Sequence, residues 1–188
     1  VAVVVDVLSF TTTVTIAIER AVTVLPYRWK DERAAAYAAA RAAALATDRR
    51  RGLSPAAMAA MTDVDRVVVP SPNGSSICFG LADQGCTVVG ASLRNRSAVA
   101  RWLEERGGTV AVVAAGERWP DGSLRPCAED LWGAGAVLSL LPDDLSPEAR
   151  LAAEAFRAAE PTLSECLRRC ASGRELADAG FGADVELA

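Results

Sequence analysis

The chain has 188 residues, 51% of them apolar, and carries a formal net charge of −4 at pH 7. This length suits one compact domain over residues 1–188, and no apolar run approaches the roughly 18 residues needed to cross a bilayer. The acidic balance argues against broad nucleic-acid binding. The absence of histidine excludes Ser-His-Asp catalysis, Cys-His catalysis and histidine-ligated zinc, and the single lysine, Lys30, excludes a P-loop of the Gly-Lys-Ser/Thr kind.

Strand-loop-helix units follow one another along the chain. The first is a continuous apolar run over 1–5, typical of a strand covered on both faces, with a helix over 11–21. The same order recurs in three further units, which are strand 64–69 with helix 77–84, strand 87–91 with helix 97–106, and strand 109–114 with helix 128–141. Such repeats imply right-handed crossovers. We therefore expect an α/β fold, a parallel or mixed β-sheet with helices on both faces.

The segments outside these units have weaker patterns. The range 22–25 indicates a short extra strand before a proline, and 31–46 is an alanine-rich, arginine-studded segment that predicts a surface helix. Two helices should follow residue 146, one begun by Ser-Pro and one by a Thr-x-x-Glu capping box at 162–165. The tail from 172 predicts a short helix and a final extended segment. We expect this helical part, about 146–188, to pack on the rest of the domain.

The five cysteines are an odd number with no signal peptide before them, which favours reduced thiols in a cytoplasmic protein. None begins the Cys-x5-Arg signature of a cysteine phosphatase. Two of them lie one helical turn apart and could share a metal ion, but no second pair completes a tetrahedral set. Buried or idle thiols are the expectation. The five are Cys78, Cys86, Cys127, Cys166 and Cys170.

Asp6 stands where the first strand ends, and the hydroxyls of Thr11, Thr12 and Thr13 follow at the start of the next helix. The loops that leave the carboxyl ends of parallel strands line the ligand crevice, and a helix start offers free amides to an anion. Asp6 is therefore a candidate metal ligand or nucleophile, with a helix-capping carboxylate as the equal alternative. The haloacid-dehalogenase type of phosphatase is disfavoured, because its second aspartate would stand at Leu8.

Three later loops also carry groups that bind ions. The loop 72–76, Pro-Asn-Gly-Ser-Ser, is either a phosphate cradle or an ordinary Asn-Gly turn with a serine cap. The loop 92–96 puts two guanidinium groups at a strand end, where they clamp an anion or are simply solvated. The long loop 116–125 leads to paired acids at a helix start, which suit the helix dipole in any case. Together, the four loops predict an acidic metal-binding corner beside a basic anion-binding one.

In this order the motifs resemble the 2-phosphosulfolactate phosphatases, a family of Mg²⁺-dependent enzymes associated with coenzyme M synthesis. The resemblance spans nearly the whole chain, and the ordered set is more specific than any of its pieces. The motifs are Asp6-Val7-Leu8 with Thr11-Thr12-Thr13, Pro72-Asn73-Gly74-Ser75, Ala91-Ser92-Leu93-Arg94-Asn95 with Ala98-Val99-Ala100, Ala115-Gly116-Glu117-Arg118, Glu129-Asp130 with Gly133-Ala134-Gly135, and Ser172-Gly173-Arg174 through Gly180-Phe181 to Asp184-Val185.

The resemblance implies hydrolysis of a phosphate ester on a small sulfonated or carboxylated acid, such as 2-phosphosulfolactate with water to sulfolactate and phosphate. Asp6, Glu129 and Asp130 would be catalytic and would hold Mg²⁺. The residues implied around the substrate are Thr11, Thr12, Asn73, Gly74, Ser75, Arg94, Asn95, Glu117 and Arg125.

The sequence departs from the family pattern in two places. Ser9-Phe10 stands where the family has Arg-Ala after Asp-Val-Leu, and only 49–55, Arg-Arg-Arg-Gly-Leu-Ser-Pro, occupies the place of a Gly-Glu-Arg and Gly-Asn-Ser-Pro region.

Two other kinds of protein remain as alternatives. One is a non-catalytic protein of the same fold that binds or senses a small anion. The other is a nucleotide-binding sheet protein, but no Gly-x-Gly-x-x-Gly or Walker-type loop supports it. The expected partner of the enzyme is a small anionic phosphate-ester substrate, and that of the sensor is a small anion, with no nucleic acid and no membrane. Self-association is open, because apolar helix residues such as 133–141 suit an interface or a core equally.

Overall fold

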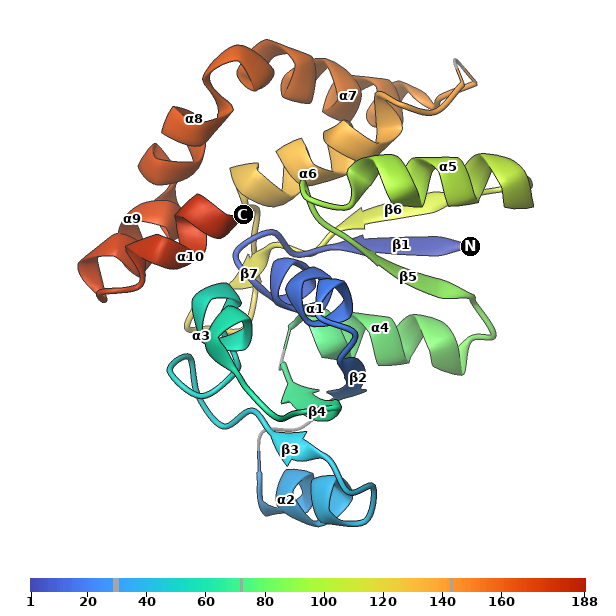
Figure 1. Ribbon diagram of the computed structural model, residues 1–188. Helices are drawn as coiled ribbons and strands as arrows, with labels where there is room; N and C mark the ends of the chain where they lie inside the picture. The colour runs from blue at the N-terminus through green and yellow to red at the C-terminus, as the bar shows by residue number, and fades with distance from the viewer. Residues whose placement is uncertain (29–30, 72, 143) are drawn as a thin grey trace.

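The first sheet of the computed structural model, which describes residues 1–28, 31–71, 73–142 and 144–188, holds three parallel strands (Figure 1). Their order is β5 (Val88–Ala91), β1 (Ala2–Val5) and β6 (Ala111–Ala114), with Ala2 opposite Val88 and Ala111. The central strand β1 is buried along its whole length. This agrees with its continuous apolar sequence, because a central strand of a parallel sheet is covered on both faces.

A second parallel sheet holds the remaining strands of this kind. Its order is β2 (Thr23–Tyr27), β4 (Arg66–Pro70) and β3 (Ala44–Leu45). β2 continues through Pro26, which lacks a backbone N–H, and its position at a sheet edge makes this possible. A short antiparallel pair, β7 (Glu117–Arg118) with β8 (Leu124–Arg125), occupies the long loop after β6.

Two helices join the sheets into one layered body (Figure 1). α1 (Phe10–Glu19) and α4 (Gly74–Asp83) each contact strands of both sheets. α5 (Arg96–Arg106) and α6 (Ala128–Leu138) pack on the first sheet, α2 (Glu32–Ala39) packs on the second, and α3 (Pro55–Ala60) packs on α1. The carboxyl ends of β1 and β4 therefore meet near the starts of α1 and α4.

The chain ends in a string of helices that curves round the first sheet and returns toward α1 (Figure 1). They are α7 (Pro147–Ala159), a 3₁₀ turn (Glu160–Thr162), α8 (Leu163–Arg169), α9 (Ala171–Asp178) and α10 (Gly182–Leu187). α7 approaches α6 so closely that a Cβ on Gly135 would lie 2.0 Å from the carbonyl oxygen of Ala152. α10 packs against α3, which places the C-terminal residues beside the loops of the second sheet.

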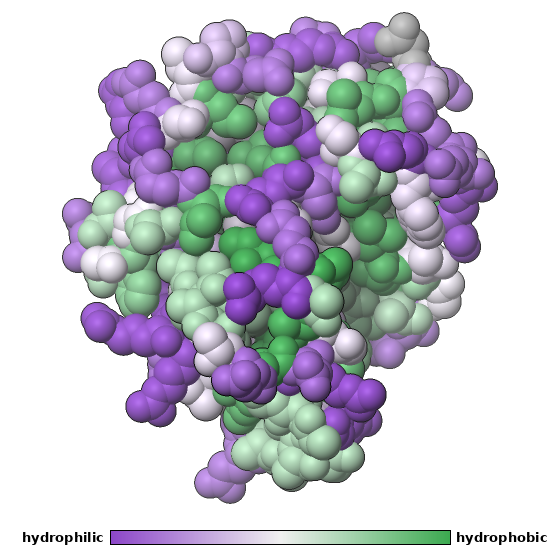
Figure 2. All heavy atoms as spheres, viewed as in Figure 1, coloured by the Kyte–Doolittle hydropathy of each residue, from purple (hydrophilic) through white to green (hydrophobic). Residues whose placement is uncertain are grey.

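Figure 2 shows hydrophilic residues at the rim and across the middle of this face, with apolar residues between them near the centre, where Figure 1 shows α1. The paler apolar area at the lower end of this view coincides with the alanine-rich helix α2. Within the described ranges, no helix combines the length and the apolar character that a membrane span requires.

The predicted fold class is confirmed, since parallel strands flanked by helices make up the structure. The sequence did not indicate that the strands would divide between two sheets. Four units have the expected order, and α4 begins at 74 rather than 77, so the Gly-Ser-Ser part of its loop lies inside the helix. Lys30 and Pro72 lie outside the described residues.

The expected helix over 31–46 is wrong in its second half. α2 ends at Ala39, Ala42 takes a left-handed backbone conformation, and Ala44–Leu45 pairs with β4 as a strand. Pairing with a buried strand therefore outweighs the helix propensity of alanine here. Ser146 does accept from the amide of Ala149 as the predicted cap of α7.

The expected extended tail is also wrong, because 182–187 forms α10. Its Asp184 is fully buried and accepts from the amide of Ala56 at 3.0 Å, in the first turn of α3. The predicted capping box at 162–165 does not form, since the 3₁₀ turn precedes α8 and the Thr162 hydroxyl lies near the Ala159 carbonyl and the Cys166 sulfur instead.

Candidate active site

Asp6 lies at the carboxyl end of β1, with only 6% of its surface exposed. One carboxylate oxygen, Oδ1, accepts from the amide of Phe10 at 3.1 Å, so the side chain holds the first turn of α1. Oδ2 lies against Gly74, the first residue of α4. The two readings of Asp6 from the sequence are therefore compatible, because one oxygen caps the helix and leaves the other for a ligand.

A small cavity of about 230 Å³, called here the Asp6 pocket, opens above this carboxylate. Its walls come from the end of β1, the start of α1, the loop before α3 and the end of β4. Asn73, which precedes α4, and Glu117 of β7 complete them. The polar side chains that line it are Asp6, Ser9, Thr13, Arg49, Ser71, Asn73 and Glu117.

The threonine cluster stabilises the turn beside this pocket. The hydroxyl of Thr11 donates to the carbonyl of Asp6 at 2.7 Å, and that of Thr12 donates to Val7 at 2.7 Å. Thr13 donates to Ser9 at 2.8 Å. Buried backbone carbonyls need such partners, so these hydroxyls stabilise the turn between β1 and α1. Thr11 and Thr12, predicted near the substrate, lie behind the pocket wall rather than in it.

The start of α4 forms the wall opposite Asp6. A Cβ on Gly74 would lie 2.7 Å from Asp6 Oδ2 and 2.3 Å from Phe10 Cδ1, so only glycine leaves room for the carboxylate. Asn73 donates through Nδ2 to the carbonyl of Gly116, which ties this wall to the loop after β6. Ser75 donates to the Val69 carbonyl at 3.2 Å and is fully buried, so its hydroxyl supports the wall from behind.

Asp130 connects the two chain segments that carry the pocket's carboxylates. Its Oδ1 accepts from the amide of Val7 at 2.7 Å, and its Oδ2 accepts from the amide of Gly116 at 2.8 Å. These amides belong to the residues next to Asp6 and Glu117. Both oxygens of Asp130 are therefore engaged in fixing where the other two carboxylates stand.

Two acidic side chains, Asp6 and Glu117, and one basic side chain, Arg49, line the pocket. Burial raises the pKa of Asp6 to about 7, although the amide of Phe10 opposes the shift and nearby Glu117 adds to it. Burial, followed by the charge of Asp6, raises the pKa of Asp130 to about 8. Burial also raises the pKa of Glu117, with Arg125 and Arg49 acting in the opposite direction. A bound cation would relieve this excess of carboxylates.

The residues present fit a magnesium ion that keeps most of its water and phosphate ligands. Mg²⁺ is usually held by one or two carboxylates together with waters and substrate oxygens, rather than by a closed protein cage. Asp6 and Glu117 line one pocket, the charge of Glu117 contributes to the raised pKa of Asp6, and the missing side chain of Gly74 leaves room beside Asp6 Oδ2. Among the described residues, no three His, Cys, Asp or Glu side chains form a group suited to a metal ion.

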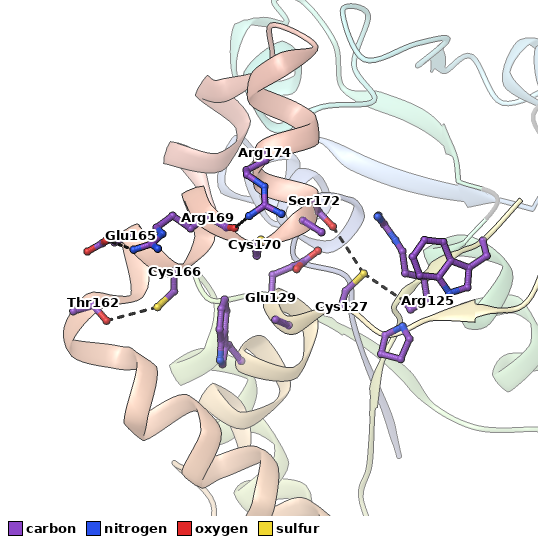
Figure 3. Close-up of a pocket in the computed structure, with 15 residues that line it drawn as sticks. Arg125, Cys127, Glu129, Thr162, Glu165, Cys166, Arg169, Cys170, Ser172 and Arg174 are labelled. Atoms are coloured by element: carbon purple, nitrogen blue, oxygen red, sulfur yellow. Dashed lines mark hydrogen bonds and ion pairs between the residues drawn. The ribbon is translucent and has the colours of Figure 1, made fainter.

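Glu129 lines a different cavity, of about 730 Å³, between α6, α8 and α9 (Figure 3). It is only 3% exposed, and Figure 3 shows Cys127, Cys170 and Ser172 around it. Burial, and then the charge of Glu129, raises the pKa of Cys127 to about 12 and that of Cys170 to about 11. These thiols are thus protonated at neutral pH and are poor nucleophiles.

The remaining predicted residues do not reach the Asp6 pocket. Arg125 lines the larger cavity and forms an ion pair with Glu175 at 2.6 Å (Figure 3). Arg94 pairs with Glu19 at 2.7 Å and donates to a carbonyl of α10. Asn95 accepts from the amide of Ser92 and donates to the Gly90 carbonyl, so it shapes its own turn. The expected basic corner is therefore engaged in structural contacts.

Arg49 supplies positive charge that was not predicted for the site. Its Nη1 donates to the hydroxyl of Ser9 at 3.0 Å, beside the pocket. The three-arginine run at 49–51 was the available signal, but nothing local to it indicates that one guanidinium reaches the end of β1.

The comparisons with known proteins agree with the motifs. A family model described as 2-phosphosulpholactate phosphatase matches residues 1–188, the whole chain. A search of curated proteins returns no match. The family match confirms the resemblance found in the sequence and, with it, a phosphatase, an enzyme that hydrolyses phosphoric monoesters.

Proposed function

The chain belongs to the 2-phosphosulpholactate phosphatase family, and from this we propose that it hydrolyses the phosphate ester of a small sulfonated or carboxylated acid with the help of Mg²⁺. Water and the ester give the free hydroxy acid and inorganic phosphate. 2-Phosphosulfolactate, and with it a place in coenzyme M synthesis, is the first substrate to test. The volume of the Asp6 pocket, about 230 Å³, suits a three-carbon acid better than a nucleotide.

The observation that carries the proposal is the carboxylate of Asp6 at the floor of this pocket, with Oδ2 facing the side-chain-free Gly74. We assign Mg²⁺ to Asp6, with Glu117 as the second carboxylate that lines the pocket. When bound, the ion supplies charge that neutralises phosphoryl oxygens and orients the ester. This differs from the set Asp6, Glu129 and Asp130 implied by the family motifs. Both oxygens of Asp130 accept from backbone amides, and Glu129 lines the other cavity, although its charge also raises the pKa values of Asp6 and Glu117.

Three parts of the protein itself are assigned to positioning the site and the substrate. Asp130 is a positioning residue that holds the backbone beside Asp6 and beside Glu117. The first-turn amides of α4, at Gly74 and Ser75, lie at a helix start that favours negative charge. Asn73 keeps the wall of α4 fixed through its bond to Gly116. Together these groups position an anionic ester over the Asp6 carboxylate.

The experiment is phosphate release from a panel of phosphorylated small acids, including 2-phosphosulfolactate and phospholactate, with Mg²⁺ and with EDTA. We expect release that requires the metal and falls at least 1,000-fold in Asp6→Asn, which removes the carboxylate charge while keeping its shape. Asp178→Asn, an exposed change on α9, is the matched control and should keep full activity. Metal-independent release, or equal rates in Asp6→Asn, would contradict the proposal.

Folded protein that raises its melting temperature with anions but releases no phosphate from any member of the panel would support the non-catalytic alternative instead.

A further inference from the structure

Arg49 lies on a well-built loop between β3 and α3. The side chain of Asp48 accepts from the amide of Arg50 at 2.8 Å, and its carbonyl accepts from the amides of Arg51 and Leu53 at 3.0 Å. These bonds fix the turn that carries Arg49. Because the turn is already ordered, the backbone that carries Arg49 need not be ordered when a ligand binds.

The guanidinium of Arg49 reaches the Asp6 pocket from this loop. Its Nη1 donates to Ser9 Oγ at 3.0 Å and lies 3.5 Å from Oδ2 of Asp184. The ring of Phe181 lies behind it, 5.8 Å from Cζ. About a third of the side chain, 34%, stays exposed. Among the described residues that line the pocket, Arg49 carries the positive charge.

Two roles fit an arginine in this place. It either balances the buried charge of Asp184 or binds an anion that enters the pocket. The first role has little support. The distance from Arg49 Nη1 to Asp184 Oδ2, 3.5 Å, is long, and Asp184 already accepts from the amide of Ala56 at 3.0 Å. Both hydrogen bonds made by Arg49 within the described part of the chain use Nη1. A guanidinium has five donors, so Nε and Nη2 are left for a forked contact with an oxyanion.

We propose that Arg49 binds the phosphoryl group of the substrate, with Ser9 and Phe181 positioning its guanidinium beside the Asp6 pocket. This inference rests on the proposed function, since it adds a substrate-binding residue to the same site. The pocket then pairs a carboxylate side, Asp6 and Glu117, with one forked cation. Inorganic phosphate, the product of the reaction, is the simplest ligand that this arrangement should hold.

The test compares Arg49→Ala with Arg51→Ala, a variant from the same loop whose guanidinium is mostly exposed and pairs only loosely with Asp48, at 3.9 Å. Calorimetric titration with inorganic phosphate in Mg²⁺ gives the Kd, and steady-state kinetics give KM and kcat. We expect Arg49→Ala to raise the phosphate Kd and the ester KM about 10- to 100-fold. Arg49→Lys should fall between, and Arg51→Ala should change either constant less than twofold.

A double variant separates binding from charge balance. Arg49→Ala with Asp184→Asn removes the buried carboxylate charge together with its partner, so it should recover the melting temperature lost in Arg49→Ala. We expect its phosphate Kd to stay raised. Recovery of phosphate binding in the double variant, or a Kd for Arg49→Ala within twofold of the unaltered protein, would overturn the proposal and assign Arg49 to stability alone.

The two proposals can fail separately. If the unaltered protein releases no phosphate from any ester, the proposed reaction fails, and the titration with inorganic phosphate still decides the role of Arg49. If phosphate does not bind the unaltered protein at all, the role of Arg49 is overturned. Metal-dependent release with unchanged KM in Arg49→Ala keeps the reaction and removes Arg49 from the site.

Discussion

The Asp6 pocket and the larger cavity beside Glu129 differ in the residues that line them and in how those residues are partnered. The Asp6 pocket is lined by the carboxylates of Asp6 and Glu117, whereas the larger cavity beside Glu129 is lined by thiols, tryptophans and arginines, of which Arg125 pairs with Glu175. The smaller one lies where the carboxyl ends of β1 and β4 meet two helix starts. The proposed assignment of the site to the smaller pocket therefore rests on where its carboxylates lie and not on cavity volume.

The difference follows from which part of the fold builds each cavity. Strand ends and helix starts converge on the Asp6 pocket, and such places bring backbone amides and loop side chains together. The larger cavity lies between helices packed side by side, α6 with α8 and α9 (Figure 3). There the buried acid Glu129 faces protonated thiols. Substitutions in the two cavities and the pH dependence of stability test this difference.

Of these, Gly74→Ala should lower activity most, because it changes the Asp6 pocket and leaves the larger cavity unaltered. The new Cβ would overlap Phe10 Cδ1 and Asp6 Oδ2, so the carboxylate must move out of place. We expect metal-dependent activity to fall at least 100-fold, measured as initial phosphate release. Gly80→Ala, in the same helix and with no atom near its Cβ, is the control and should retain activity. Equal loss in both variants would mean that α4 is destabilised as a whole.

Smaller effects should distinguish two adjacent carboxylates, Asp130 and Glu129. Asp130→Asn leaves one of two buried amides, Val7 or Gly116, without its acceptor. We expect a loss of about 2–3 kcal/mol in the free energy of unfolding and a 10- to 100-fold fall in kcat. Glu129→Gln should lower kcat less than tenfold, because this side chain lines the other cavity. For each variant, urea denaturation gives the free energy of unfolding and initial rates of phosphate release give kcat.

A 1,000-fold fall in kcat in Glu129→Gln, with an unchanged free energy of unfolding, would contradict this assignment. It would mean that Glu129 acts in the same site as Asp6, as one of the metal ligands.

The features that could be predicted from the sequence are local ones. A continuous apolar run that stops at a carboxylate is enough to indicate a buried strand with Asp6 at its end, and the structure has both. The roles of Asp130 and Arg49 depend on contacts over 123 and 40 residues, which no spacing along the chain reveals. The division of the strands between two sheets was hidden for the same reason, because valine-rich strands of either sheet look alike.

The last helix, α10, shows how contacts between distant residues determine local structure. The segment 182–187 has little pattern of its own, yet it forms α10 because Asp184 caps α3 and Val185 packs into the core. The same contact places Asp184 beside Arg49. A family motif near the C-terminus therefore supports the pocket from behind, although 128 residues separate Asp184 from Ala56.

The last prediction needs no substitution. It compares the stability of the metal-free protein at different pH values. In the folded chain, burial raises the pKa of Asp6 to about 7 and that of Asp130 to about 8, whereas both titrate near 4 when unfolded. The folded state then binds more protons over this interval, so its stability falls as pH rises. In EDTA, the urea midpoint should therefore fall between pH 5 and pH 9.

Mg²⁺ should reverse this fall, because a metal ligand must be deprotonated and the ion then stabilises the charged carboxylates. The gain in urea midpoint on adding Mg²⁺ is thus expected to be larger at pH 8 than at pH 5. Asp178→Asn should keep the same slope, since that residue is exposed. A flat profile in EDTA would mean that the carboxylates of the Asp6 pocket are already compensated, and the contrast between the two cavities would lose its electrostatic basis.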